Sequence, residues 1–310
     1  KLSQFKFNIN DNYIINNLFN GYKSLNKKDL TQFQNIFQLE PGTNLEINLD
    51  LKIKKKKYWH PKLQIDKSLS YNDTVKIIHQ LLIKSLELRM RSDVPVAFCL
   101  SGGIDSGYLA SLASKVFKKK ISTFSLIDED PRYDESNNIN AIIQDLKCES
   151  TKIKINSSKN NAFNEIKQLT HYHDSPIATL SYYIHSKMTK KIAEKKFKVS
   201  ISGVGSDEIF TGYYDHFLSF FQTIRSSNYF NNNLESWKIN VRPLIRNPNL
   251  REHELYIKNP NNRENVYEKN FNISEFSKLN INSNFNENFF CKELLRNRMM
   301  NEMFHETVPV

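Results

Sequence analysis

A short run of hydroxyl, glycine and carboxylate residues early in the chain has the composition of an anion-binding loop. Residues 94–100, VPVAFCL, are apolar apart from the interruption at Pro95 and can form a buried strand, and residues 101–106 read SGGIDS. A helix is expected from Ser106 to Phe117. Two adjacent glycines let a backbone approach an anion without a Cβ in the way. A helix N-terminus also directs unpaired N–H groups and its positive dipole end at that anion. We expect this loop to bind phosphate.

The other side chains of the run fit the same chemistry. The hydroxyls of Ser101 and Ser106 would add hydrogen-bond donors, and Asp105 offers the hard oxygen ligand that Mg²⁺ prefers. The loop is not of the Walker type, because no Gly-Lys-Ser/Thr follows the glycines. The Ser-Gly-Gly-x-Asp-Ser pattern instead resembles the pyrophosphate loop of ATP pyrophosphatases, which cleave ATP to AMP and pyrophosphate. A ligand-free glycine turn between strand and helix is the alternative.

A second acidic loop follows a later apolar run. The strand expected over residues 198–202 ends in Gly203-Val204-Gly205-Ser206-Asp207-Glu208. Ligands of open parallel sheets bind beyond the carboxyl ends of the strands, so two such loops could face one crevice. Asp105 and Asp207 would then be two carboxylates near one triphosphate, which suffices to hold Mg²⁺ together with phosphate oxygens and water. The alternative makes Asp207 and Glu208 helix-start residues that the dipole favours.

Alternation of strands and helices predicts an α/β fold with a parallel sheet flanked by helices. A wide apolar stripe predicts a helix from about Tyr71, with Asn72 or Asp73 as its cap. Residues 226–288 are rich in Asn, Arg and Pro and predict irregular connections with short helices, and residues 291–304 predict a mixed helix. The remaining expected strands are 121–127 and 151–155, and the remaining expected helices are 136–147, 162–171 and 179–195.

Composition describes a globular protein with a basic balance. The 310 residues carry a net charge of +11, which suits a nucleic-acid binder but also an enzyme that handles ATP and carboxylates. The lysine run at 52–57 predicts a solvated edge strand. No apolar run is long enough to span a membrane. The three cysteines have no metal-pair spacing and indicate a reducing compartment, the cytoplasm; they are Cys99, Cys148 and Cys291.

The first 62 residues differ from the rest. Turn signals at Asn20-Gly21 and Pro41-Gly42, followed by the alternating TNLEINLDLKI, predict the last strands of a β-rich domain. The order NLFNGYKSL, IFQLEPGTNLEI and KKYWHP is similar to the end of the glutaminase domain in class II amidotransferases of the asparagine synthetase type. In that family an N-terminal cysteine hydrolyses glutamine; this chain, which begins at Lys1, lacks that residue and is interpreted as cut from something longer. The expected domains are 1–62, a glutaminase remnant, and 63–310, a synthetase domain.

The two loops together resemble one family. LSGGIDS at 100–106 and ISGVGSDEIFTGY at 201–213 resemble the paired signatures of asparagine synthetase-type ATP-dependent amide ligases, and HDSPIATLSYYIHSKM between them extends the match. The resemblance implies a pyrophosphatase-like fold that adenylates a carboxylate, after which ammonia displaces AMP to give an amide. By position, it implies adenosine contacts from Leu100, Leu126, Ser202 and Gly203, pyrophosphate contacts from Ser101, Gly102, Gly103 and Ser106, and Mg²⁺ ligation by Asp105 and Asp207, which are also the expected catalytic residues.

The resemblance also implies partners. ATP and Mg²⁺ are the expected cofactors, and a small carboxylic acid and ammonia from glutamine are the expected substrates. A glutaminase domain is expected in the full-length chain, and a homodimer is one expected assembly. Metal and N–H donors would stabilise the charge that builds on the departing pyrophosphate. No aromatic-basic platform or RNA module is recognisable, which argues against nucleic acid as a partner.

Two departures from the family pattern keep other functions open. Asparagine-forming members usually place Glu where this chain has Val204, and valine cannot transfer a proton. The family's Ser-Met-x-x-Ser-x-Glu-x-Arg-x-Pro-Phe-Leu-Asp segment is also expected beyond Val310. The resemblance makes aspartate the default acceptor, and the departures leave a sugar acid or an antibiotic precursor as alternatives. An RNA-modifying ATP pyrophosphatase and a non-catalytic scaffold are the other two readings.

Two further groups could bind ligands. His171, His173 and Asp174 lie close together and could hold a metal, although no matched ligand pair accompanies them. Asp134 and Glu135 belong to an acidic stretch after the second strand, on the side of the sheet where the site is expected. That stretch is either a solvated loop or a substrate-facing one.

Overall fold

The computed structural model describes residues 6–155, 162–254 and 287–309. They form two compact units. The sheet unit comprises Gln64–Val204, and the helical unit comprises Lys1–Leu63 together with Gly205–Val310. The first break, after residue 63, falls beside the predicted boundary at 62, while the predicted extent of the two domains stays a prediction.

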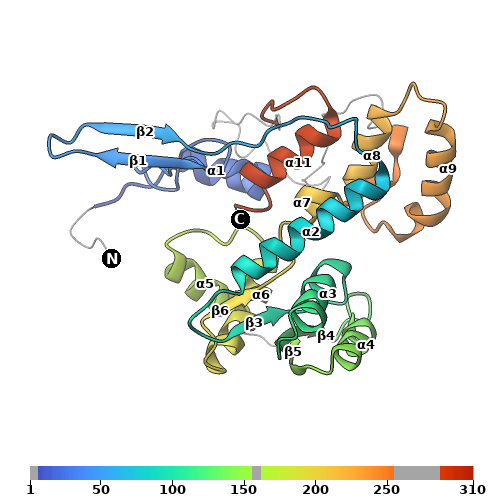
Figure 1. Ribbon diagram of the computed structural model, residues 1–310. Coiled ribbons are helices and arrows are strands. Elements are labelled where there is room, and N and C mark those ends of the chain that lie inside the picture. Colours follow the sequence, from blue (N-terminus) through green and yellow to red (C-terminus); the bar gives the residue numbers. More distant parts are fainter. Residues whose placement is uncertain (1–5, 156–161, 255–286, 310) are drawn as a thin grey trace. The chain divides into compact units, whose positions relative to one another are not determined.

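The sheet unit is built on a parallel sheet, as predicted (Figure 1). Its four described strands lie in the order β5-β4-β3-β6. Phe98 of the central β3 pairs with Thr123 of β4 on one side and with Ile201 of β6 on the other. The strand bounds are β3 Val96–Cys99, β4 Ser122–Asp128, β5 Glu149–Ile155 and β6 Val199–Ile201.

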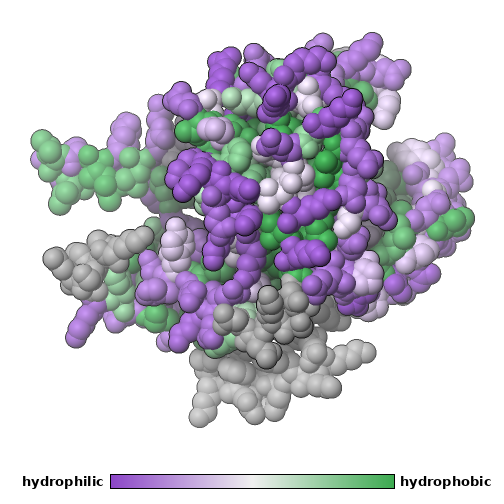
Figure 2. All heavy atoms as spheres, turned by 90° about the horizontal axis from the view of Figure 1, so that it is seen from below, coloured by the Kyte–Doolittle hydropathy of each residue, from purple (hydrophilic) through white to green (hydrophobic). Residues whose placement is uncertain are grey.

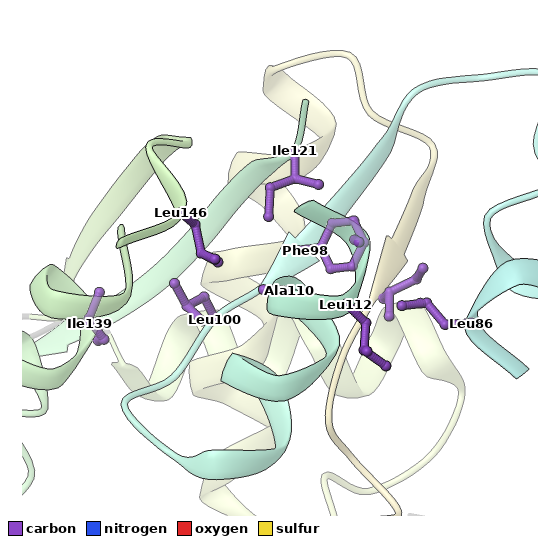
Figure 3. Packing of buried hydrophobic residues seen from close by; sticks show 10 residues of the cluster. Leu86, Phe98, Leu100, Ala110, Leu112, Ile121, Ile139 and Leu146 are labelled. Atoms are coloured by element: carbon purple, nitrogen blue, oxygen red, sulfur yellow. The ribbon is translucent and has the colours of Figure 1, made fainter. Parts of the chain in front are cut away.

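Successive side chains of a strand point to opposite faces, and apolar side chains lie on both faces of this sheet. Helices therefore cover both faces. Phe98 and Leu100 pack into a core shared with three helices, shown in Figure 3. Ala97 and Phe124 pack on the other face against Ile192. Each such buried side chain contributes about 1.5–3 kcal/mol. The first face carries α2 (Tyr71–Arg89), α3 (Ile104–Ser111) and α4 (Ser136–Leu146), and the second carries α6 (Leu180–Glu194), which follows α5 (Ala162–His173).

Two helix starts differ from the predictions. The cap of α2 is Ser70, whose hydroxyl accepts from the Asp73 N–H at 3.1 Å and donates to the Asp73 carboxylate at 2.6 Å. The prediction of Asn72 or Asp73 as cap was therefore wrong: Asp73 completes the cap from within the first turn. Helix α3 begins at Ile104, earlier than the predicted Ser106, and continues into a π-helical turn over Leu112–Val116.

The helical unit combines one hairpin with several short helices. Its strands are β1 (Thr43–Ile47) and β2 (Ile53–Lys57), paired antiparallel. Residues before the Asn20-Gly21 turn form a helix, since their apolar residues recur at helical spacing and the Asn10 side chain accepts from the Tyr13 N–H. A second core lies around Phe221 and Trp237. The helices are α1 (Asp11–Asn20), η1 (Tyr22–Ser24), α7 (Asp207–Phe210), α8 (Tyr214–Thr223), α9 (Phe230–Asn240), η3 (Arg242–Leu244), η4 (Pro248–Arg251) and α11 (Leu294–His305).

The hairpin exposes both its lysines and its apolar residues. All five residues of β2 are exposed, as predicted for a solvated edge strand. Figure 2 shows hydrophobic and hydrophilic side chains mixed along the hairpin, at the left of the view. The exposed apolar residues here are Leu45, Ile47, Leu49, Leu51 and Ile53. None of the helices in the described ranges is long and apolar enough to cross a membrane.

Candidate functional site

Residues 100–106, here called the sheet loop, fold around two serine hydroxyls. Strand β3 ends at Cys99, and the Leu100 N–H donates to the Phe124 carbonyl at 2.8 Å. Ser106 Oγ accepts from the Ser101 N–H at 3.0 Å and lies 2.9 Å from Ser101 Oγ. Ser101 Oγ also accepts from the Gly103 N–H at 3.2 Å. The two hydroxyls thus hold the turn in the shape that brings the chain into α3.

The Leu100 side chain lies in the core rather than at the loop surface. It is 3% exposed and packs among the residues of Figure 3. A contact between Leu100 and a nucleotide would therefore have to come from its main chain. Leu126 lies near the carboxyl end of β4, opposite Ile153 of β5, and is half-buried.

Gly102 is pressed against the start of α4. A Cβ at this position would lie 2.8 Å from Glu135 Cβ and 2.9 Å from Asn138 Cβ, so no other residue fits without movement. The Gly102 N–H donates to Glu135 Oε2 at 2.8 Å. A carboxylate thus already occupies a donor that the sequence assigns to phosphate.

The neighbouring Asp134 bonds Ser136 instead of Gly102. Its carboxylate accepts from the Ser136 N–H at 3.0 Å and from the Ser136 hydroxyl. These two bonds lower the pKa of Asp134 below its ordinary value. Of the two acidic residues that could have been substrate-facing, Glu135 is therefore the one that contacts the sheet loop.

Gly203 brings the end of β6 to the first turn of α3. A Cβ at Gly203 would lie 3.0 Å from Asp105 Cβ and 3.0 Å from the Ser106 nitrogen. This proximity follows from the pairing of β6 with β3, because the carboxyl ends of parallel neighbours meet at one edge. Asp105 and Ser202 are exposed, and no described residue hydrogen-bonds the Asp105 carboxylate. That carboxylate is open to a metal ion, which fits its predicted role.

Residues 205–213, here called the acidic loop, belong to the helical unit. Asp207 begins α7, and a Cβ at Gly212 would lie only 1.6 Å from Asp207 Oδ1. The Asp207 carboxylate therefore lies directly on the Gly212 backbone, and a side chain at this position would displace it. Val204, the predicted departure from the family, is 67% exposed.

Glu208 and Tyr213 form a buried pair within the acidic loop. Glu208 is 1% exposed and accepts from the Tyr213 hydroxyl at 2.7 Å. Burial and this carboxylate raise the pKa of Tyr213 above its ordinary value. The second carboxylate oxygen of Glu208 is buried without a hydrogen-bond partner among the described residues.

An ionic cluster around Arg298 of α11 lies in the same unit. Arg298 is 2% exposed. Burial alone would lower the pKa of Arg298, but its carboxylate partners raise the value instead. This cluster was not predicted from the sequence, although charged residues interrupt the apolar spacing of α11. The nitrogen–oxygen distances from Arg298 are 3.1 Å to Asp215, 3.1 Å to Glu287, 2.9 Å to Glu302 and 2.5 Å to Glu306.

A histidine connects this ionic cluster to the acidic loop. His216 Nδ1 accepts from the Gly212 N–H at 3.2 Å, and its Nε2 lies 2.7 Å from Glu302 Oε2. Because Nδ1 accepts, the proton of a neutral ring is assigned to Nε2, which donates to Glu302.

These contacts bear on where a metal could bind. In the part of the chain that is described, Asp215, His216 and Glu302 are the one group with ligand atoms close enough to hold a metal. Arg298 and the Nε2 proton already occupy those atoms. His171, His173 and Asp174 do not form such a group; His173 packs instead against Tyr172 and Tyr182.

Comparison with known proteins identifies relatives of this chain. The chain is 32% identical over 176 residues to asparagine synthetase [glutamine-hydrolyzing] 1 of Bacillus subtilis, a match that covers 57% of this chain and 27% of that protein. It is 24% identical over 200 residues to amidase chyE of Penicillium rubens, covering 59% of this chain and 30% of that protein. The chain thus spans about a third or less of these relatives.

A solved structure and a family profile complete the comparison. The structure of the NH3-dependent NAD synthetase from Campylobacter jejuni, in complex with nitrate, aligns with a TM-score of 0.31 and 18% identity, covering 59% of this chain and 90% of that one. The asparagine synthase profile matches residues 78–306, a range that includes the sheet loop, the acidic loop and all of α11. This chain therefore belongs to the asparagine synthase family.

Proposed function

We propose that the chain carries the synthetase half of an ATP-dependent amide ligase. In this reaction a substrate carboxylate attacks the α-phosphorus of ATP, pyrophosphate leaves, and ammonia derived from glutamine then displaces AMP to give the amide. The observation that carries the proposal is the sheet loop at the carboxyl edge of β3, with the Gly203 backbone of β6 against Asp105. Family membership supports the ATP-dependent ligase class.

The residue roles follow from the positions described above. Ser101, Gly102, Gly103 and Ser106 would hold the pyrophosphate, and Leu100, Leu126, Ser202 and Gly203 would contact the adenosine part. Mg²⁺ would be held by Asp105 and Asp207 and would neutralise charge on the phosphates. The exposed Asp105 carboxylate, which no described residue bonds, supports its part of this assignment. Bringing Asp207 to the same ion is part of the proposal.

The acceptor and the nitrogen source extend the proposal. Aspartate is the default acid, and the exposed Val204 in place of the family's Glu keeps a sugar acid or an antibiotic precursor as the second choice. The exposed apolar residues of the hairpin support packing of this segment within a complete glutaminase domain. Three free thiols support a reducing compartment such as the cytoplasm.

The decisive experiment is ATP–pyrophosphate exchange by the natural full-length protein with Mg²⁺, measured against a panel of acids headed by aspartate. Exchange that depends on one acid would establish adenylation and identify the acceptor. Exchange with none of the acids, in a protein that binds ATP, would contradict the proposal and favour a non-catalytic scaffold.

A further inference from the structure

His216 is a fully enclosed side chain with a partner on each ring nitrogen. It is 3% exposed and bridges the Gly212 N–H and the Glu302 carboxylate. The two partners differ in burial: Gly212 belongs to the acidic loop and is exposed, whereas Glu302 is 1% exposed in the ionic cluster. The imidazole therefore links the acidic loop to α11, in which Glu302 lies 86 residues after His216.

The turn that His216 holds is strained. Thr211 has φ +69° and ψ 163°, a region that β-branched residues avoid and that costs on the order of 1–3 kcal/mol. Such a conformation persists only where the surrounding structure over-determines it. The hydrogen bond from the adjacent Gly212 N–H to His216 Nδ1 is a contact of the kind that supplies this constraint.

The position of the turn decides the position of Asp207. The Asp207 carboxylate lies on Gly212 so closely that a Cβ there would overlap Oδ1. A shift of Gly212 toward α7 would therefore displace this carboxylate. A shift away from α7 would remove the backbone contact that now limits its position.

We propose that His216 is a positioning residue for the metal-binding carboxylate of the acidic loop. Glu302, itself held by Arg298 at 2.9 Å, orients the imidazole; the imidazole holds Gly212; and Gly212 sets where Asp207 Oδ1 lies. The inference rests on the proposed function in one respect, that Asp207 ligates Mg²⁺. Groups that hydrogen-bond a metal ligand directly change metal affinity about 10- to 100-fold when removed, and His216 acts on Asp207 through Gly212, so we expect an effect at the lower end of this range.

Two substitutions separate the two bonds of His216. H216Q reaches Glu302 with an amide but has no acceptor at the Nδ1 position, whereas H216N keeps an oxygen near that position for the Gly212 N–H. In calorimetric titrations of Mg²⁺ into the protein with ATP, and in the Mg²⁺ dependence of ATP–pyrophosphate exchange, we expect H216Q to raise the Mg²⁺ requirement about tenfold and H216N to restore most of that loss. The matched control is H305Q on α11, because His305 contacts Asn26 and Asn288 instead of the acidic loop.

The outcomes discriminate the inference from the proposed function. An unchanged Mg²⁺ requirement in H216Q beside an active wild type would overturn the inference alone, as would an equal rise in H305Q. No acid-dependent exchange by the wild type would overturn the proposed function and the inference with it. Should H216Q fail to fold, E302Q keeps the side-chain shape and tests the same link; it should also raise the requirement, and a wild-type value would overturn the inference.

Discussion

The sheet loop and the acidic loop each follow a strand and each carry one predicted Mg²⁺ ligand, yet they are supported in opposite ways. The sheet loop is held by its own serines and by Glu135, and its Asp105 is exposed. The acidic loop is held through His216 by the buried ionic cluster of a distant helix. A loop of the first kind can lose its ligand without losing its fold. In a loop of the second kind, stability and ligand position depend on the same contacts.

The largest effect should come from removing the centre of the ionic cluster. Arg298→Met leaves the buried carboxylates Glu302 and Glu306 uncompensated, so we expect a loss of about 3–5 kcal/mol in the free energy of unfolding. Urea denaturation measures this. Lys238→Met, which breaks the more exposed Lys238–Glu235 pair, should cost less than about 1 kcal/mol. Equal losses for the two variants would remove the distinction between the loops.

Loss of the exposed ligand should affect activity and not stability. For Asp105→Ala we expect acid-dependent ATP–pyrophosphate exchange to fall by on the order of a hundredfold or more, because a metal contact to the phosphates is lost. The unfolding free energy should change by less than about 1 kcal/mol, since only a helix N-terminal charge is removed. Asp145→Ala is the control: it removes the exposed ion pair between Asp145 of α4 and Lys115, and it should retain exchange. An active Asp105→Ala would contradict the site assignment.

A substitution that relieves the strained backbone of Thr211 should stabilise the acidic loop. Thr211→Gly permits the positive φ at no steric cost, and we expect the unfolding free energy to rise by up to about 1 kcal/mol after the entropy of glycine is subtracted. Thermal denaturation would show a higher midpoint. Thr223→Gly at the end of α8 provides the contrast and should destabilise. A destabilised Thr211→Gly would mean that the Thr211 side chain contributes more than its backbone costs.

The smallest effect concerns the carboxylate on the sheet loop. Glu135→Gln removes a negative charge that competes with phosphate for the Gly102 N–H, so Mg²⁺–pyrophosphate should bind about two- to fivefold more tightly. Isothermal titration calorimetry with inorganic pyrophosphate measures this affinity. Asp134→Asn loses the same charge one residue away without touching Gly102 and should change it less. Equal gains in both would indicate a general charge effect, and weaker binding in Glu135→Gln would show that Glu135 supports the anion site.

The sheet unit could be predicted from the sequence because its signals are local. Apolar runs of strand length alternate with helical periodicity, and Ser101–Ser106 lies where one pattern changes into the other. The errors there were small: the cap of α2 was Ser70 rather than Asn72 or Asp73, and α3 began at Ile104 rather than Ser106.

The support of the acidic loop could not be predicted in the same way. Arg298 and Glu302 are charged residues that a sequence pattern assigns to a solvated face, and only their partners make their burial tolerable. Those partners include Asp215 and His216, more than 80 residues earlier in the chain. Residues that pair over such a sequence separation produce no periodic pattern from which their contact could be predicted. Only Gly212, beside Asp207, lay within the motif that the sequence analysis recognised.

The two glycine contacts at the start of α3 have a consequence for engineering and for sequence drift. A methyl group at Gly102 would overlap the start of α4, and a methyl group at Gly203 would lie 3.0 Å from the first turn of α3. An insertion near either glycine would therefore displace Asp105.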